Sequence, residues 1–257
     1  MRPALVVPYH DPTGVMFRIL RENLPRLKEH VDHVYMSVET DDWATQHIRF
    51  LQADDFFTLF PVERGLGLGE HFAMLYRQAS ALADSDQMLH LCFLDRLTFV
   101  LGTEHGDAFL ADLDTLSPDE TPLIYHRSPK AWASHPKNYL ELESFVTRIG
   151  ETLFGKSLDY AWCHFVIRAG LLREIMPHVK NPDLSMVAEI VLLTQDHIHT
   201  RDVDWLAWED PFLFSRDPLE FKRERESNPE EVQKRLSYVL PMVETLARFA
   251  RDGGNKS

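Results

Sequence analysis

The segment that most constrains the fold of this chain is 87–100, which reads QMLHLCFLDRLTFV. Its first half, Met88 to Leu94, is a near-continuous apolar run that ends abruptly in Asp95 and Arg96. A short run without alternation is typical of a strand buried on both faces of a parallel sheet. Charged residues after such a strand lie where open α/β sheets bind ligands. We therefore predict an α/β fold with a site at Asp95, although Asp95 could also cap the strand or pair with Arg96.

Two strand-like segments, separated by a helical one, come earlier in the chain. The strands are 4–8 (ALVVP) and 33–38 (HVYMSV). Between them, 13–24 has apolar residues at helical spacing, and Pro25 complicates or breaks that helix. Strand, helix and strand make a βαβ unit, and 56–61 reads as a third strand.

A glycine-rich stretch, 63–70 (ERGLGLGE), precedes another helical segment. Glycines at alternate positions indicate a loop with unusual dihedral angles or a close backbone approach. A loop that leads into a helix N-terminus can bind an anion, and a neighbouring arginine adds positive charge. The spacing is neither the dinucleotide fingerprint G-x-G-x-x-G nor a P-loop, so a plain flexible turn is the alternative. The candidate phosphate-binding residues are Arg64, Gly65 and Gly67.

The order of these parts resembles the nucleotide-diphospho-sugar glycosyltransferases of the GT-A fold. The opening VVPYHDP is similar to the family's first strand, and the basic, glycine-rich loop is followed by an apolar strand that ends in Asp95. The likeness is greatest to inverting family-2 enzymes and to retaining glucosyl-3-phosphoglycerate and mannosylglycerate synthases, and it covers residues 4–205. It implies a mixed, mostly parallel sheet flanked by helices. It also implies a nucleotide-sugar donor beside Asp95 and Arg96, and a small soluble acceptor. The base and ribose of that donor would be held by residues at the ends of the first two strands, namely Pro8, Tyr9, Glu39 and Asp42.

The chain departs from that family at position 97. An Asp-x-Asp motif would have its second acid there, and this chain has Leu97. A divalent cation that bridges two phosphates needs several hard oxygen ligands. The resemblance therefore implies Mn²⁺ or Mg²⁺ held weakly, together with the nucleotide, by Asp95, with further ligands from Glu104, Asp107 or a later histidine. His199 shares a strand face with His197 and could complete such a site, or the two histidines lie on an exposed edge strand. Two alternatives stay open: nearby cationic side chains neutralise the phosphates without metal, or catalysis has been lost.

Two segments are candidates for the acceptor side. Segment 126–137 is basic and aromatic, and it is either a solvated loop or a loop over a phosphate or carboxylate group of the acceptor. Segment 159–168 (DYAWCHFVIR) occupies the place where the resembled family lines its acceptor side. Within it, His164 reads as a buried, hydrogen-bonded histidine rather than as a ligand. The resemblance implies acceptor contacts from Trp132, Lys137 and Trp162, and a catalytic part for Asp159.

Glu189 is the candidate catalytic base. It lies in an apolar helical segment, 186–193, at the place where the resembled family has its acid, the base of inverting members. Burial in such a segment could raise the pKa of the carboxyl group. Glu209 and Asp210, which follow an aromatic stretch, are the runner-up acids. Alternatively, Glu189 faces solvent or caps a neighbouring element.

The charge balance limits the classes of partner. The chain has 27 Lys and Arg residues against 40 Asp and Glu residues, a formal net charge of −13, which argues against nucleic-acid binding. Cys92 and Cys163, its only cysteines, lie in apolar surroundings without CxxC spacing, which indicates a reducing compartment such as the cytoplasm. No apolar run approaches the roughly 18 residues of a membrane span, and we expect no signal peptide.

Three parts are expected along the chain. Residues 1–215 would form the donor and acceptor domain, 216–252 a charged link and an amphipathic helix, and 253–257 a disordered tail. Asn228, Pro229 and the acids after them make a good helix start. Pro241 should kink that helix. The helix could pack back on the domain or form a homodimer contact.

Three functions are compatible with these residues. The first is a glycosyltransferase that moves a sugar from a nucleotide-diphosphate donor to a small acceptor. The second is a catalytically degenerate nucleotide- or sugar-binding protein on the same scaffold, which the leucine at position 97 favours. The third is a nucleotidyltransferase, which is disfavoured because no long basic, glycine-rich loop follows the first strand. A shared fold does not decide among them.

Overall fold

The computed structural model describes residues 2–253. Its centre is a seven-stranded sheet in the order β3-β2-β1-β4-β6-β5-β7. The strands are β1 (Ala4–Pro8), β2 (His33–Glu39), β3 (Phe57–Val62), β4 (Met88–Cys92), β5 (Leu123–Arg127), β6 (His164–Arg168) and β7 (His199–Val203). Strand β6 is antiparallel to both of its neighbours, β4 and β5. The other neighbouring pairs are parallel, so the sheet is mixed and mostly parallel.

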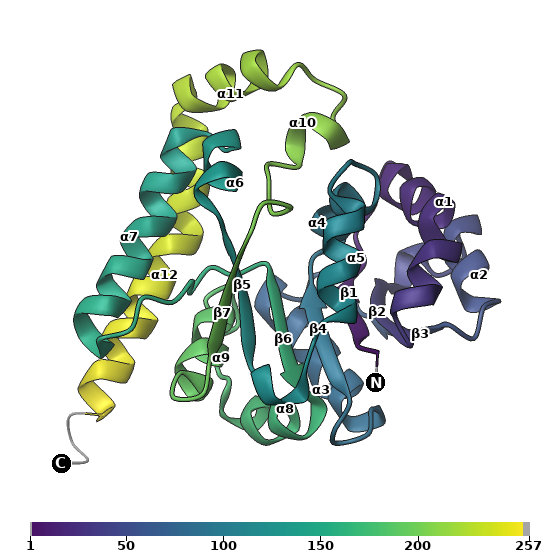
Figure 1. Cartoon of the computed structure of the whole chain (residues 1–257), viewed down its shortest axis with the longest axis horizontal. Coiled ribbons are helices and arrows are strands. Elements are labelled where there is room, and N and C mark those ends of the chain that lie inside the picture. The colour runs from purple at the N-terminus through teal and green to yellow at the C-terminus, as the bar shows by residue number, and fades with distance from the viewer. Residues whose placement is uncertain (1, 254–257) are drawn as a thin grey trace.

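Helices cover both faces of this sheet (Figure 1). One face packs on α1 (Val15–His30), α2 (Gln46–Gln52), α4 (Leu94–Leu101) and α5 (Gly106–Asp114). The other face packs on α3 (Leu68–Leu82), α7 (Lys137–Phe154), α8 (Ala169–Ile175), α9 (Met186–Thr194) and α12 (Pro229–Gly253). Three short helices complete the chain: α6 (Pro129–Ser134), α10 (Asp210–Leu213) and α11 (Pro218–Ser227). Each sheet face therefore buries an apolar core of its own.

The strand directions bring particular loops to one edge of the sheet. Because β1, β2, β4, β5 and β7 share a direction, their carboxyl ends lie at the same edge. The amino end of the reversed strand β6 lies there too. The segments after Pro8, Glu39, Cys92 and Arg127 therefore meet the segment before His164. This is the edge at which open α/β sheets bind ligands.

The predicted fold class is confirmed in its architecture. The structure has the expected mixed, mostly parallel sheet, the flanking helices and the C-terminal helical extension of an α/β fold. Strand β1 has the predicted bounds, and α1 continues through Pro25 instead of ending there. Burial of Leu20, Leu24 and Leu27 against the sheet offsets the hydrogen bond that the proline cannot donate.

Three segments differ from the expectation. Strand β4 ends at Cys92, so Asp95 lies in the first turn of helix α4 and not at a strand end. The expected loop at 126–137 contains α6, whose cap is Ser128. The expected charged link at 217–227 forms helix α11, whose cap is Asp217. In both cases a Ser-Pro or Asp-Pro start satisfies the first backbone N–H groups, although the apolar pattern of the segment is weak.

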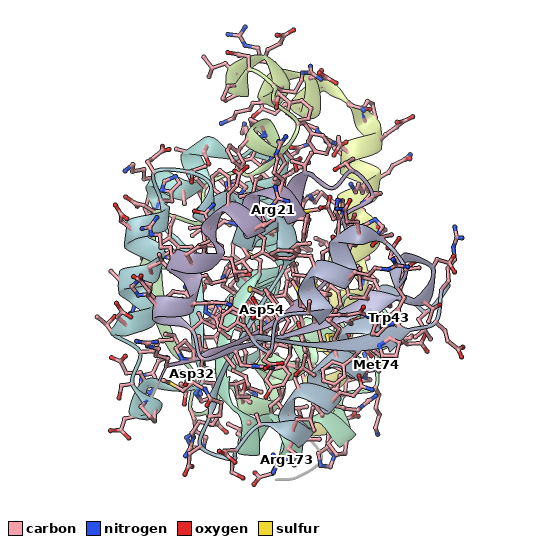
Figure 2. The ribbon with its side chains drawn as sticks, turned by 90° about the vertical axis from the view of Figure 1, so that its right-hand side faces the viewer. Arg21, Asp32, Trp43, Asp54, Met74 and Arg173 are labelled. Carbon is pink, nitrogen blue, oxygen red and sulfur yellow. The ribbon has the colours of Figure 1, made fainter. Side chains whose placement is uncertain are left out.

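Helix α12 packs back on the domain. It lies beside α7 (Figure 1), and it buries Val239, Met242 and Leu246 in the core shared with α9. In the side view of Figure 2, α11 lies beyond the end of the sheet, where it leads into α12. The helix includes Gly253, the first residue of the expected tail, whereas 254–257 lie outside the described residues. None of the helices in 2–253 combines the length and apolar character needed to cross a bilayer.

Candidate functional site

Two adjoining cavities open at the ligand-binding edge of the sheet. The strand-end cavity, of about 480 Å³, is lined by residues that follow β1 and β2, among them Pro8, His10 and Glu39. The helix-side cavity, of about 250 Å³, has walls from α7, α12 and the segment before β6. Both cavities are lined by Leu68, Phe93, Asp95 and Leu184. The two cavities therefore form one cleft, with Asp95 at the junction.

The start of helix α4 explains why Leu97 stands where the resembled family has an acid. Asp95 is partly exposed in the cleft, whereas Leu97 is fully buried in the core beneath α1. Residues two apart on a helix do not face the same side. A carboxylate at position 97 would therefore enter the apolar core and could not join Asp95 at a metal ion. Arg96, between them, turns into the helix-side cavity.

The strand-end cavity contains several polar groups but no arginine or lysine among its described lining residues. Its carboxylates are Glu39 and Asp95. His71 is hydrogen-bonded to Ser37 Oγ at 2.6 Å, and burial lowers the pKa of this histidine while Glu39 opposes the shift. Of the residues predicted to hold the nucleotide, Pro8, Glu39 and Asp95 line this cavity, whereas Tyr9 and Asp42 do not. A diphosphate here would need a cation, or would have to reach the arginines of the neighbouring cavity.

The glycine-rich stretch makes close backbone contacts to the loop before α9. A Cβ atom on Gly69 would come within 2.0 Å of the Asp183 carbonyl oxygen, and one on Gly67 within 2.9 Å of the Pro182 oxygen. The Glu70 N–H donates to Pro182 O at 3.2 Å, so one of the free N–H groups of the helix start is already used. Gly65 has φ 91°, a left-handed conformation that suits glycine.

Arg64 lies outside both cavities. Its side chain is 76% exposed and pairs with Asp41 at 2.9 Å. The structure therefore does not bring Arg64 to Asp95. Gly67 and Gly69 serve the packing of 182–183 on α3.

The helix-side cavity has a buried ion pair beside Asp95. Arg96 on α4 pairs with Glu209, which directly precedes α10. Glu209 is 5% exposed, and its neighbour Asp210 lines the same cavity. Burial raises the pKa of Glu209 from its usual 4.5 to about 7; Arg96 opposes this rise, and Asp210 and Asp95 add to it. A carboxyl group with a pKa near neutral can exchange a proton with a bound hydroxyl group.

A second charge cluster, formed by Arg127, Glu143 and Arg235, lines the same cavity. Glu143 on α7 accepts hydrogen bonds from Arg127 at 3.0 Å and from Arg235 at 2.9 Å. The guanidinium of Arg235 also lies 3.6 Å from the centre of the Tyr139 ring. This cluster joins β5, α7 and α12. Lys234, in the turn of α12 next to Arg235, is an exposed cation that also lines the cavity.

The residues predicted for the acceptor side lie on both sides of the Arg127–Glu143 pair and not in one cavity. Trp162 lines the helix-side cavity, but it is 1% exposed and its indole N–H donates to Val187 O at 3.0 Å. Trp132 and Asp159 line a different cavity of about 220 Å³ behind Arg127. Burial raises the pKa of Asp159, and Arg127 opposes the rise. Lys137 is exposed on α7, where its ammonium group pairs with Glu141.

Glu189 lies outside the cleft. Its side chain is fully enclosed, and one carboxylate oxygen accepts hydrogen bonds from the backbone N–H groups of Lys180 and Asn181, both at 2.8 Å. The other oxygen accepts from Arg248 at 2.7 Å. Glu189 therefore ties the loop before α9 to α12. This geometry does not suit a base that must reach an acceptor hydroxyl group.

Asp95 and His199 are not brought together. His199 begins β7 and pairs in register with Leu123, at the amino end of β5, while Asp95 lies beyond the carboxyl end of β4. The amino ends and the carboxyl ends of parallel strands lie at opposite edges of the sheet, one strand length apart. A shared metal site of Asp95 and His199 is therefore excluded by the strand directions.

The helical pattern of the sequence contains a signal for this charge cluster. Glu143 lies one turn from Tyr139 and from Val146, and all three are buried on one side of α7. Arg235 has the same spacing to Val232 and Val239 on α12. A charged residue on the apolar side of an amphipathic helix needs a buried partner, and that pattern marks both residues.

Comparisons with known proteins add little to this picture. The sequence matches no protein-family model and no curated protein sequence. Among solved structures, the chain is similar to a crystal structure of 4-diphosphocytidyl-2C-methyl-D-erythritol synthase, at 11% sequence identity and a TM-score of 0.42, over 95% of this chain and 99% of that one. A likeness this weak carries no argument about activity, so the chemistry has to be argued from the cleft itself.

Proposed function

We propose that this protein is a transferase that uses a nucleotide-diphosphate-sugar donor and a small acceptor. The observation that carries the proposal is the pair of adjoining cavities that share Asp95. The strand-end cavity suits the donor, because it lies over the carboxyl ends of β1 and β2, where open sheets bind nucleotides. The helix-side cavity suits the acceptor, because its buried charges can orient hydroxyl and acidic groups.

The transfer needs a group that removes a proton from the acceptor hydroxyl as the new bond forms. Glu209 fits this part better than Glu189, because it lines the cavity next to Asp95 and has a raised pKa. Arg96, paired with Glu209, would attract the negative charge that develops on the departing diphosphate. Asp95 would orient the donor at the junction of the two cavities.

A divalent cation at the donor would have few protein ligands. Glu39 and Asp95 are the carboxylates of the strand-end cavity, and among residues 2–253 no group of three close metal ligands includes either of them. Hard cations such as Mn²⁺ and Mg²⁺ require about six oxygen ligands. Phosphate oxygens would supply the rest, so we propose that any such cation binds only together with the nucleotide.

The first prediction concerns donor binding. A nucleoside diphosphate with Mn²⁺ should raise the melting temperature, because a ligand at about 100 times its Kd stabilises the folded state by about 2.7 kcal/mol. Asp95→Asn should weaken binding about tenfold or more, while Arg64→Ala should leave it nearly unchanged, because Arg64 points away from the cleft toward Asp41. Differential scanning fluorimetry with UDP, GDP, ADP and CDP measures this.

Arg64→Ala is the control for Asp95→Asn in this experiment. Both remove one charge near the glycine-rich stretch and the strand-end cavity, but only one of the two residues lines that cavity. Loss of binding in Arg64→Ala with retention in Asp95→Asn would place the phosphates on the glycine-rich stretch. Absence of a shift with every nucleotide at millimolar concentration would exclude the transferase proposal.

The second prediction concerns pH. If Glu209 acts as the base, kcat/KM should rise with pH along a limb with an apparent pKa of about 7. The same raised pKa affects stability in the opposite direction. The folded state binds the Glu209 proton more tightly than the unfolded state does. The contribution of Glu209 to the stability of the fold is therefore fully present below the usual pKa of 4.5 and is lost as pH rises through about 7. Kinetics and thermal unfolding over pH 5 to 9 test both signs.

A catalytically degenerate binding protein is the second candidate. It is favoured by the strand-end cavity, which has no described cationic side chain of its own to stabilise a leaving diphosphate. Such a protein would bind the nucleotide and show the Asp95→Asn effect. It would release no nucleoside diphosphate from any nucleotide-sugar at any pH between 5 and 9.

A further inference from the structure

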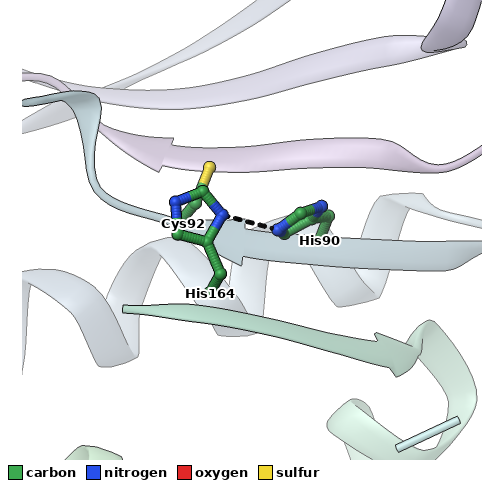
Figure 3. Close-up of side chains that lie close together, drawn as sticks. All are labelled: His90, Cys92 and His164. Atoms are coloured by element: carbon green, nitrogen blue, oxygen red, sulfur yellow. Dashed lines mark hydrogen bonds between the residues drawn. The ribbon is translucent and has the colours of Figure 1, made fainter. Parts of the chain in front are cut away.

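Three metal-ligating side chains converge within the sheet, away from the cleft lining. His90 and Cys92 are two apart on β4, so both point to the same face of the sheet. His164 begins β6 directly opposite Cys92 in the antiparallel register. One donor atom from each side chain lies within 4.8 Å of the donor atoms of the other two. Figure 3 shows the three side chains close together, with a hydrogen bond between His90 and His164.

The three side chains are completely buried. Each of them has 0% of its surface exposed. His90 Nε2 and His164 Nδ1 lie 2.9 Å apart, which is a hydrogen-bond distance, and in the described residues the second nitrogen of each ring has no partner. Burial lowers the pKa of both histidines. The hydrogen bond between the two rings uses the lone pair of the accepting nitrogen, so a metal ion at these two nitrogens would replace that hydrogen bond.

The surroundings do not explain this polar cluster. Phe109 and Trp205 pack edge-on against His164, and Tyr125 stacks on His90. Buried positions inside a sheet normally hold Val, Ile or Leu, because a polar group without partners costs free energy there. Two imidazoles and a thiol at one point therefore call for a ligand that all three can share.

We propose that His90, Cys92 and His164 bind one zinc ion. Imidazole and thiolate are the donors that zinc prefers, whereas Mg²⁺, Ca²⁺ and Mn²⁺ prefer oxygen. Zinc binds nitrogen at about 2.0–2.1 Å, so two nitrogens on one tetrahedral ion lie about 3.3 Å apart. The two rings would have to separate by only a few tenths of an ångström from their observed spacing.

Zinc binding would release one proton, from the thiol, and move a second one within the histidine pair. Cys92 loses its thiol proton to solvent and forms a zinc–sulfur bond, and the proton shared between the rings moves to the outer nitrogen of whichever ring lacks one. The ion would link β4 to β6 at the only antiparallel junction between β4 and the rest of the described sheet. Because the aromatic shell encloses the site, zinc would enter while the chain folds and not through the folded surface.

The test is to unfold the full chain and refold it with Zn²⁺ or with Co²⁺, a spectroscopic substitute for zinc. After desalting, elemental analysis should find about one zinc per chain, and the cobalt form should show a near-ultraviolet thiolate-to-cobalt band. Both protein forms should melt at a higher temperature than protein refolded with a chelator. Cys92→Ala should lose the band and the stoichiometric zinc. Cys163→Ala is the matched control, because it removes the only other cysteine, and it should keep both.

Circular dichroism confirms that each variant has refolded, and Cys92→Val replaces Cys92→Ala if the smaller residue leaves a cavity that prevents folding. Zinc that stays bound in the folded Cys92 variants would belong to exposed histidines such as His197 and His199, and it would overturn the proposal. Wild-type protein that refolds with Zn²⁺ and retains none after desalting would overturn it as well, and would leave His90 and His164 as a hydrogen-bonded pair.

Discussion

Turnover is expected to fall about a hundredfold or more when Glu209 is replaced by Gln, while nucleotide binding survives. Gln has the size of Glu and resembles its protonated form, but it cannot accept a proton from an acceptor hydroxyl group. Glu209 lines the helix-side cavity beside Asp95, and the strand-end cavity does not include it. The loss should therefore appear in kcat and not in the nucleotide affinity.

The measurement uses release of nucleoside diphosphate from a nucleotide-sugar, with water or an added small polyol or hydroxy acid as acceptor. Two further variants sharpen the result. Asp210→Asn changes the next carboxylate of the same cavity, and Glu189→Gln changes the carboxylate outside the cleft. Turnover that survives in Glu209→Gln but disappears in Asp210→Asn would transfer the role to Asp210. Loss of the alkaline rise in kcat/KM only in Glu209→Gln would confirm that Glu209 causes it.

The Glu209→Gln variant also removes the ion-pair partner of Arg96, and the effect of that loss has to be measured in the same variant. Glu209→Gln leaves the buried guanidinium of Arg96 without its counter-ion, which lowers stability. The melting temperature and the nucleotide affinity of this variant separate that effect from the loss of a base. A variant that is folded and binds nucleotide, yet turns over slowly, supports the catalytic part of Glu209.

The free energy of unfolding is expected to fall by roughly 2–5 kcal/mol when Glu189 is replaced by Ala. The carboxylate accepts hydrogen bonds from the backbone N–H groups of Lys180 and Asn181 and from the side chain of Arg248. Alanine would leave these two partly buried N–H groups without their acceptor and would open a cavity beneath α12. Urea unfolding measured by circular dichroism gives the value.

Arg248→Ala is the matched control for this prediction. This variant removes the half-exposed partner of the ion pair and leaves the hydrogen bonds from Lys180 and Asn181 to Glu189 intact. The free energy of unfolding should therefore fall by clearly less than in Glu189→Ala. Glu189→Gln should also be milder, because its carbonyl oxygen can still accept from the backbone. If Glu189→Gln keeps wild-type stability but loses turnover, the alternative role of Glu189 as the base is supported instead.

The sequence by itself determined the class of fold and the edge of the sheet at which to look. The apolar run at 88–92 and the strand at 4–8 have no alternation, so each could only be buried on both faces, and both are central strands of the sheet. Charged and polar residues after these runs mark the edge of the sheet. Pro8 and Glu39 end the first two strands and Asp95 follows the run at 88–92, and all three line the strand-end cavity.

The helical start of α4 could not be found by the same reasoning. A buried strand and a buried helix have similar apolar runs, and the boundary at Phe93 depends on how α4 packs against α1 and α5. This boundary decides that Leu97 faces the core and Asp95 the cleft. The same kind of packing decides that Gly69 admits the backbone of Asp183.

Only the tertiary structure decided which carboxylate lies in the cleft. Glu189 and Glu209 both stand beside apolar neighbours in the sequence, and no local pattern distinguishes them. The return of α12 over α7 and α9 brings Arg248 to Glu189, while the segment after β7 brings Glu209 to Arg96. These contacts join residues 59 and more than 100 positions apart in the chain. A local sequence pattern specifies periodicity, burial and capping, but the partner of a buried charge depends on the path of the whole chain.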